Sequence, residues 1–109
     1  MARGQRFVDR VQQYLLSVPP KRMPDMASVA RDLGLSARSL RRRLADDGVS
    51  YKALVQSVLE IRATQMLGDP NRTIQETAAE MGFSDPTAFQ RAFKRWKGMT
   101  PGPFKEAKP

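Results

Sequence analysis

The sequence predicts an all-α protein of seven helices, in which two helix-turn-helix lobes are joined by a long linker helix. Three observations support this fold class. Apolar residues recur at spacings of three and four along most of the 109 residues, as in helices with one buried face. Glycine and proline punctuate the chain at intervals of helical length. A pattern of helix, glycine turn and helix occurs twice, about 50 residues apart.

Lobe 1 is expected over about residues 5–49 and contains three helices. Apolar residues at helical spacing indicate a first helix, which ends at the prolines that start with Pro19. Asp25 is a residue type that caps helix N-termini, and the helix that it begins stops at a glycine. Ser36 opens the third helix in the same way. The second and third helices form a first helix-turn-helix over about residues 26–47.

The linker helix is expected over about residues 50–68. Leu54, Val58 and Ile61 follow helical spacing along it, and Gly68, followed by Asp-Pro, ends it. The stretch from Ser50 to Leu67, about 18 residues, rises about 27 Å at 1.5 Å per residue.

Lobe 2 is expected over about residues 73–106. Thr73 and Glu76 form a possible capping box at the start of the fifth helix. The sixth helix begins near Pro86, because proline is tolerated in a first turn. A short last helix follows the Thr-Pro pair near the C-terminus. The fifth and sixth helices form a second helix-turn-helix over about residues 74–97.

The positive charge of the chain is concentrated in two short segments. The formal net charge is +8, with 19 Lys and Arg against 11 Asp and Glu. Residues 36–44 and residues 86–97 hold four basic residues each and no acid, so the rest of the chain is neutral. Each segment is the second helix of its helix-turn-helix. A polyanion, nucleic acid before membrane, is therefore the partner that the charge predicts.

Composition excludes several classes of function. The chain has no Cys and no His, which rules out disulfides, thiolate or imidazole metal sites, and the catalytic sets that need these residues. No apolar run approaches the roughly 18 residues that a membrane helix needs, and the first residues do not have the apolar stretch expected of a signal peptide. We expect no metal, no cofactor, no catalytic residue and no membrane association.

The two helix-turn-helix units are related by an internal repeat. Residues 29–36 match residues 77–84 in the order of small, acidic, apolar, glycine, apolar and serine positions. The apolar pairs of the following helices also match. In a DNA-binding helix-turn-helix, the second helix enters the major groove. Two ordinary helical hairpins are the alternative, but they leave the two basic second helices unexplained.

The repeat carries a resemblance to a known family. Residues 74–101 resemble the second helix-turn-helix signature of the AraC/XylS family of bacterial transcription regulators, in the glycine-aromatic turn, two spaced aromatics and the closing Gly-Met-Thr-Pro. Residues 29–54 are similar to the first helix-turn-helix of the family, and the likeness covers about residues 22–106. The whole chain, 1–109, is expected to be one such domain. Leu59 departs from the family, since many members carry an arginine early in the linker helix.

The resemblance implies a sequence-specific double-stranded DNA-binding transcription regulator, most often an activator, located on the nucleoid in the bacterial cytoplasm. It also implies contact with RNA polymerase at a promoter. The linker length is compatible with two recognition helices in successive major grooves. Members commonly carry a further domain for an effector or for dimerisation, and nothing here resembles it. We therefore expect either a stand-alone member or a fragment of a longer regulator, and a domain that is monomeric by itself.

Helical angles divide the third helix into an inward and an outward face. Leu40 and Leu44 set the inward direction, and three arginines lie about 80–180° from it. Arginine donates two hydrogen bonds to the guanine edge. The family's contact positions in this helix map onto the same residues. The expected base contacts here are Arg38, Arg41 and Arg42.

The flank of this helix leaves two interpretations open. Arg43 lies beside the inward face and is expected to bind a phosphate or to serve the structure. Pairs of Arg42 with Asp46 and of Arg43 with Asp47, four residues apart, are an alternative. Such exposed pairs contribute only about 0.3–0.5 kcal/mol each and compete weakly with phosphate.

The sixth helix divides in the same way. Its aromatic residues Phe89, Phe93 and Trp96 share one face, and this spacing is typical of a core rather than of a base-stacking platform. Polar residues occupy the opposite face. Backbone amides at the starts of the two helix-turn-helix units, near Ser28 and Thr73, are further candidates for phosphate. The expected base contacts are Thr87, Gln90 and Arg91, although Arg91 could also serve a phosphate. The expected phosphate contacts are Lys94, Arg95 and Lys97, and a merely solvated face is the alternative for Arg95 and Lys97.

Three other classes of function are weaker. A non-specific or RNA-binding protein would place aromatics for stacking, which this sequence does not. A helix-turn-helix that binds proteins would expose apolar residues on its second helices, which here are rich in Arg and Gln. An enzyme would need a nucleophile, a metal or a pocket beside its carboxylates, and the pairs Asp46-Asp47 and Glu76/Glu80 have none in the sequence.

Overall fold

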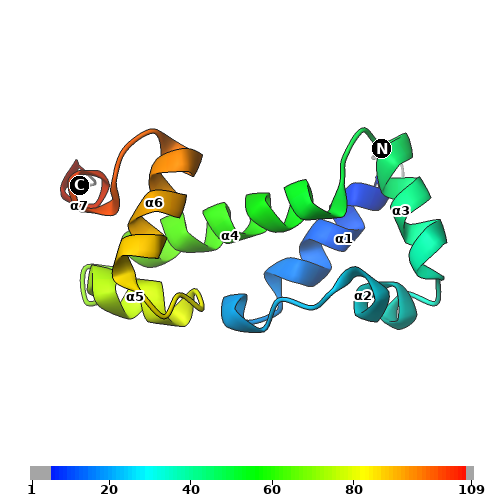
Figure 1. Ribbon diagram of the computed structural model, residues 1–109, viewed down its shortest axis with the longest axis horizontal. Coiled ribbons are helices and arrows are strands. Elements are labelled where there is room, and N and C mark those ends of the chain that lie inside the picture. Colours follow the sequence, from blue (N-terminus) through cyan, green and yellow to red (C-terminus); the bar gives the residue numbers. More distant parts are fainter. Residues whose placement is uncertain (1–5, 108–109) are drawn as a thin grey trace, which may run out of the picture. The chain divides into compact units, whose positions relative to one another are not determined.

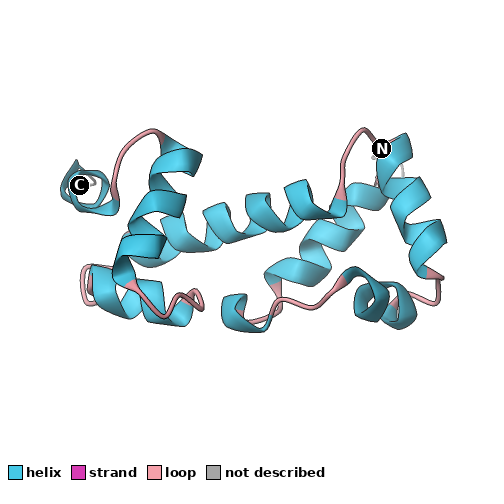
Figure 2. Ribbon diagram, in the orientation of Figure 1, coloured by secondary structure: helices cyan, strands magenta, loops and turns pink. Residues whose placement is uncertain are grey.

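The computed structural model describes residues 6–107. The ends of the expected 1–109 domain, and residue 5 where lobe 1 was expected to begin, lie outside these residues. Within them the chain is all-helical, without a strand (Figures 1 and 2), which confirms the predicted fold class. The elements are α1 (Phe7–Leu16), the 3₁₀ helix η1 (Pro20–Arg22), α2 (Met26–Asp32), α3 (Ala37–Asp46), α4 (Tyr51–Leu67), α5 (Ile74–Glu80), α6 (Pro86–Lys97) and α7 (Pro101–Ala107).

The described chain divides into two compact units. Unit 1 contains residues 6–18 and 23–58, and unit 2 contains residues 19–22 and 59–107. The division differs from the expected lobes in two places. The four residues around η1, expected in lobe 1, group with unit 2, and α4 contributes its first half to one unit and its second half to the other. None of the helices between residues 6 and 107 is long and apolar enough to cross a membrane.

Unit 1 is a small helical core with capped helices. The Asp25 carboxylate accepts a hydrogen bond from the Ser28 amide at 2.8 Å, and Ser36 Oγ accepts from the Ser39 amide at 3.0 Å, so α2 and α3 begin where the sequence predicts. Apolar side chains from α1, α2, α3 and the first half of α4 meet in one cluster. Its members are Val8, Val11, Leu15, Val29, Ala30, Leu40, Leu44, Leu54 and Val58.

Unit 2 is built around aromatic rings. Phe89 and Phe93 on α6 are fully buried, and their ring centroids lie 5.9 Å apart. Phe83 extends the row at 5.5 Å from Phe89, while Phe104 of α7 lies 5.1 Å from Phe93 with its ring edge-on. Such contacts add to the burial of apolar surface. Trp96 packs at the edge of the same cluster, which confirms that the aromatic face of α6 is core.

The two glycine turns have the same geometry. Gly34 and Gly82 have φ angles of 74° and 92°, a region that favours glycine. After each glycine, an amide donates back across the turn: Leu35 N–H to the Ala30 carbonyl at 2.8 Å, and Phe83 N–H to the Ala78 carbonyl at 3.0 Å. This bond closes a helix C-terminus. The internal repeat in the sequence is therefore a repeat in backbone structure.

Candidate nucleic-acid interface

The outward face of α3 carries a row of arginines. Leu40 and Leu44 are fully buried, and the side chains of Arg38, Arg41 and Arg42 are exposed. Within the described residues, no acidic group lies within ion-pair distance of these three guanidinium groups. The alternative pair of Arg42 with Asp46 is therefore not formed, and the donors of this face are open to a partner.

Arg43 and Asp47 have structural partners in α1 rather than each other. The Arg43 guanidinium lies 5.4 Å from the centroid of the Phe7 ring, which is a cation–π contact. The Asp47 carboxylate accepts a hydrogen bond from the Val8 amide at 3.0 Å. Of the two roles expected for Arg43, this geometry favours the structural one. Helical angles missed it because Phe7 is far from Arg43 in the sequence.

The outward face of α6 carries short polar groups near its N-terminus. The Asp85 carboxylate caps the helix by accepting from the Thr87 amide at 3.0 Å, and Pro86 occupies the first position. Thr87, Gln90 and Arg91 are exposed on the side opposite the buried aromatics. Their hydroxyl, amide and guanidinium groups can donate to or accept from base edges. The sequence placed all three on this face.

The basic residues at the end of α6 are of two kinds. Lys94 and Arg95 are exposed and have no acidic partner within 4 Å among the described residues. Lys97 has partners: its ammonium lies 3.3 Å from a Glu60 carboxylate oxygen and 5.9 Å from the Phe104 ring centroid. Lys97 therefore joins α6 to α4 and α7, which counts against its expected role as a free phosphate contact.

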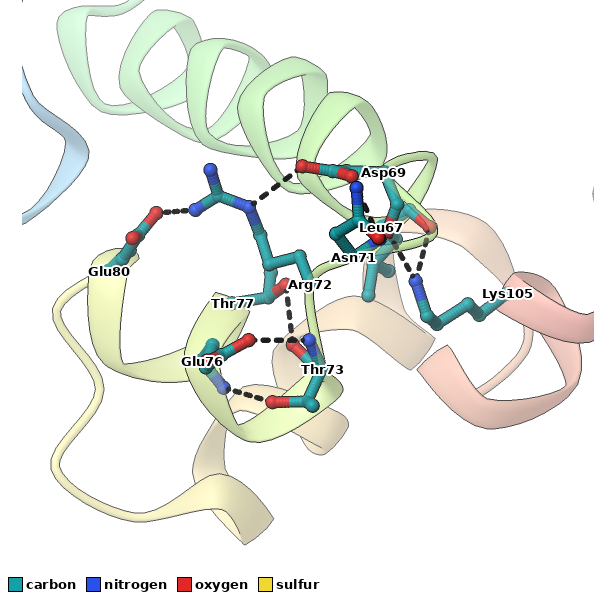
Figure 3. A network of polar contacts seen from close by, with 9 residues as sticks. All are labelled: Leu67, Asp69, Asn71, Arg72, Thr73, Glu76, Thr77, Glu80 and Lys105. Atoms are coloured by element: carbon teal, nitrogen blue, oxygen red, sulfur yellow. Dashed lines mark hydrogen bonds and ion pairs between the residues drawn. The ribbon is translucent and has the colours of Figure 1, made fainter.

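The amides expected to hold phosphate at Ser28 and Thr73 are already engaged. The Ser28 amide donates to Asp25, a hydrogen bond that holds the pKa of this carboxyl below its usual value. The Thr73 amide donates to the Glu76 carboxylate at 2.8 Å, and Thr73 Oγ1 accepts from the Glu76 amide at 3.0 Å (Figure 3). A phosphate would have to displace a carboxylate at either place, so neither amide is available in this conformation.

The carboxylates of α5 belong to the same polar network. Arg72 forms ion pairs with Glu80 and, at 3.8 Å, with Asp69 (Figure 3). Lys105 donates to the carbonyls of Leu67 and Asp69 at 3.0 and 2.9 Å and so closes the C-terminal end of α4. Sequence reasoning assigned no role to these two basic residues. The charges of Arg72 and Lys105 serve the structure, as does that of Arg43, whereas the other basic residues of α3, and Lys94 and Arg95 of α6, have no acidic partner among the described residues.

The geometry defines a class of protein with two helix-turn-helix units, each with an exposed polar and basic second helix. A family model described as a helix-turn-helix domain matches residues 29–107. The ornithine utilization regulator of Pseudomonas aeruginosa is 38% identical over 101 residues, which cover 93% of this chain and 30% of that protein. The chain spans less than a third of the length of the curated relatives it matches.

Solved structures show the same fold. A DNA-binding transcriptional dual regulator from Escherichia coli K-12 matches with a TM-score of 0.88 at 24% identity, over 97% of this chain and 95% of that one. The DNA-binding domain of AdpA, a global transcriptional factor solved in complex with a target DNA, matches with a TM-score of 0.74 at 22% identity, over 92% and 90%. The chain belongs to the AraC-type helix-turn-helix family, and the resemblance found in the sequence is confirmed.

Proposed function

We propose that this chain binds double-stranded DNA sequence-specifically and regulates transcription, with α3 and α6 each inserted into a major groove. One observation carries the proposal. In both units, the second helix of the helix-turn-helix exposes donors without an acidic partner in the described chain, whereas Arg72, Lys97 and Lys105 are held by protein oxygens.

The chemistry of the exposed groups assigns their roles. Bidentate arginine contacts favour guanine, and amide groups pair with adenine edges. Base contacts then fall to Arg38, Arg41 and Arg42 in α3 and to Thr87, Gln90 and Arg91 in α6. Lys94 and Arg95, further along α6, suit phosphates that border the groove. Arg43 and Lys97 contribute to DNA binding through the position of the helices.

Regulation of transcription is supported by the relatives. The ornithine utilization regulator is named as a regulator, and the AdpA domain of the same fold is bound to a target DNA. Activation, contact with RNA polymerase, a cytoplasmic location on the nucleoid and a monomeric domain belong to the proposal as expectations from the family. So does the absence of enzymatic activity, since the α5 carboxylates Glu76 and Glu80 hold Thr73 and Arg72.

Selection of duplexes from a random pool tests sequence specificity. A specific binder enriches one sequence, and competition with heparin and scrambled duplex then separates specific from electrostatic binding. The logarithm of the DNA association constant should fall against the logarithm of the salt concentration, by roughly 0.9 for each phosphate that the exposed basic residues neutralise. A pool in which no sequence is enriched would overturn sequence-specific binding. A slope of log K against log salt near zero would overturn nucleic-acid binding as a whole.

A further inference from the structure

A basic residue outside both recognition helices lies against the turn of the second helix-turn-helix. Lys21 belongs to η1, which groups with unit 2. A Cβ placed on Gly82, the glycine between α5 and α6, would come within 3.0 Å of both Cα and Cβ of Lys21. Gly82 also has a φ of 92°. Its lack of a side chain therefore allows both the turn and the close approach of Lys21.

The charge of Lys21 has no ion-pair partner in the part of the chain that the structure describes. Its side chain is exposed, and the described residues place no carboxylate within 4 Å of its ammonium. The two acidic residues nearest to Gly82 in the sequence have other partners: Glu80 pairs with Arg72, and Asp85 caps α6 through the Thr87 amide. A positive charge is thus held at this turn without an acidic partner among residues 6–107.

The position of the turn indicates what this charge can bind. Gly82 precedes the start of α6 at Pro86 by four residues, and the N-terminal part of a recognition helix is the part that contacts base edges. Phosphates border the groove on both sides of such a helix. Lysine is a compact point charge on a flexible stem, which suits a phosphate better than the directional pattern of a base edge.

We propose that Lys21 binds a DNA phosphate beside the groove that α6 enters. The second unit then takes one of its backbone contacts from the connection between α1 and α2, far from α6 in the sequence. This inference rests on the proposed DNA binding and adds a phosphate contact to it. The distribution of charge along the sequence did not predict Lys21 as a DNA contact, because Lys21 lies in the part of the chain whose charges sum to zero.

The Lys21→Gln variant of the full chain tests the contact. Binding to the selected duplex is measured over a series of salt concentrations, and phosphate ethylation interference locates the contacts. We expect the salt slope to become shallower by about 0.9 and interference to disappear at one phosphate beside the α6 bases. The selected sequence should stay the same. Arg10→Gln is the matched control, since Arg10 is an exposed residue of α1 in unit 1, and it should change neither quantity.

The outcomes separate this inference from the proposed function. A wild-type chain with a steep slope, together with Lys21→Gln at the same slope and the same interference pattern, would overturn the phosphate contact and leave DNA binding intact. A wild-type slope near zero would overturn both. The thermal midpoint of Lys21→Gln should equal that of the wild type, because the removed group is exposed, and a large drop would show that Lys21 serves folding instead.

Discussion

The carboxylate of Asp47, at the C-terminal end of α3, accepts a hydrogen bond from the Val8 amide in the first turn of α1 at 3.0 Å. First-turn amides have no partner within their own helix, and a negative charge at this end is favoured by the helix dipole. Arg6 reinforces the junction by donating to the Asp47 carbonyl at 3.1 Å. One end of the first recognition helix is thereby anchored to α1.

Replacement of Asp47 by alanine should destabilise the protein. The variant loses a capping acceptor and a charge at the α1 N-terminus, which together contribute about 1–2 kcal/mol to stability. Chemical denaturation measures the change in the free energy of unfolding. Asp46→Ala is the control, because Asp46 is the exposed neighbour on α3 and should change stability by less than about 0.5 kcal/mol. Equal effects of the two variants would contradict the anchoring role.

Replacement of Thr73 by alanine distinguishes a helix cap from a phosphate contact. The variant leaves the Glu76 amide without its acceptor, so it should lose about 1 kcal/mol of stability. The salt slope of DNA binding should not change, since the Thr73 groups are occupied by Glu76 in the folded protein. If the slope became shallower by about one unit, Thr73 would instead be a phosphate contact.

Tyr51 gives a prediction on pH. Its hydroxyl donates to the Pro24 carbonyl at 2.6 Å, and burial raises its pKa to about 12. The pKa of Tyr51 in the folded protein lies above the value near 10 in the unfolded chain. The stability that the neutral hydroxyl contributes is therefore complete below pH 10 and is lost as the pH rises through 12. Tyr51→Phe should cost about 1 kcal/mol near neutrality. The difference in unfolding free energy between the two proteins should shrink between pH 10 and 12, and a constant difference would contradict it.

Local signals in the sequence were sufficient to predict where the α-helices begin and end. Asp25, Ser36 and Thr73 are caps that the structure shows in place, because a cap depends on residues only three positions away. The glycines Gly34 and Gly82 were found for the same reason. The outward faces of α3 and α6 followed from helical angles once the buried leucines and phenylalanines were identified.

Contacts between distant residues were not predictable in this way. The cation–π contact of Arg43 with Phe7 and the ion pair of Lys97 with Glu60 join residues more than 30 positions apart. A charged residue on a helix flank looks the same in the sequence whether its partner is a phosphate or another helix. The 3₁₀ helix η1 was not predicted from the sequence, because η1 begins at the second of two consecutive prolines, a pattern that predicts only the end of a helix.

Substitutions in the recognition helices should separate base contacts from phosphate contacts. Arg41→Ala or Arg38→Ala should lose about 1–3 kcal/mol of binding free energy and relax the preference at one base pair. Arg95→Ala should weaken binding to all duplexes evenly and lower the salt slope by about one unit. Lys97→Gln should leave the slope unchanged, because its charge is paired with Glu60. An unchanged sequence preference in the Arg38 and Arg41 variants would refute the assignment of base contacts.

The length of α4 bears on the DNA site that one chain can occupy. This helix has 17 residues without a break, which corresponds to about 25 Å at 1.5 Å per residue. We expect one chain to reach two successive major grooves, which are one pitch of B-DNA, about 34 Å, apart. Because α3 and α6 are two different helices of one chain, a site that they contact together would need no twofold symmetry. We expect a non-palindromic site with two contacted base clusters about 10 bp apart. Bending of the DNA to fit both helices would cost on the order of 1–6 kcal/mol.

Footprinting on the selected duplex gives the spacing between the two contacted base clusters, and sedimentation of the complex gives the number of chains per site. A palindromic site that binds two chains would refute the arrangement with one chain in two grooves.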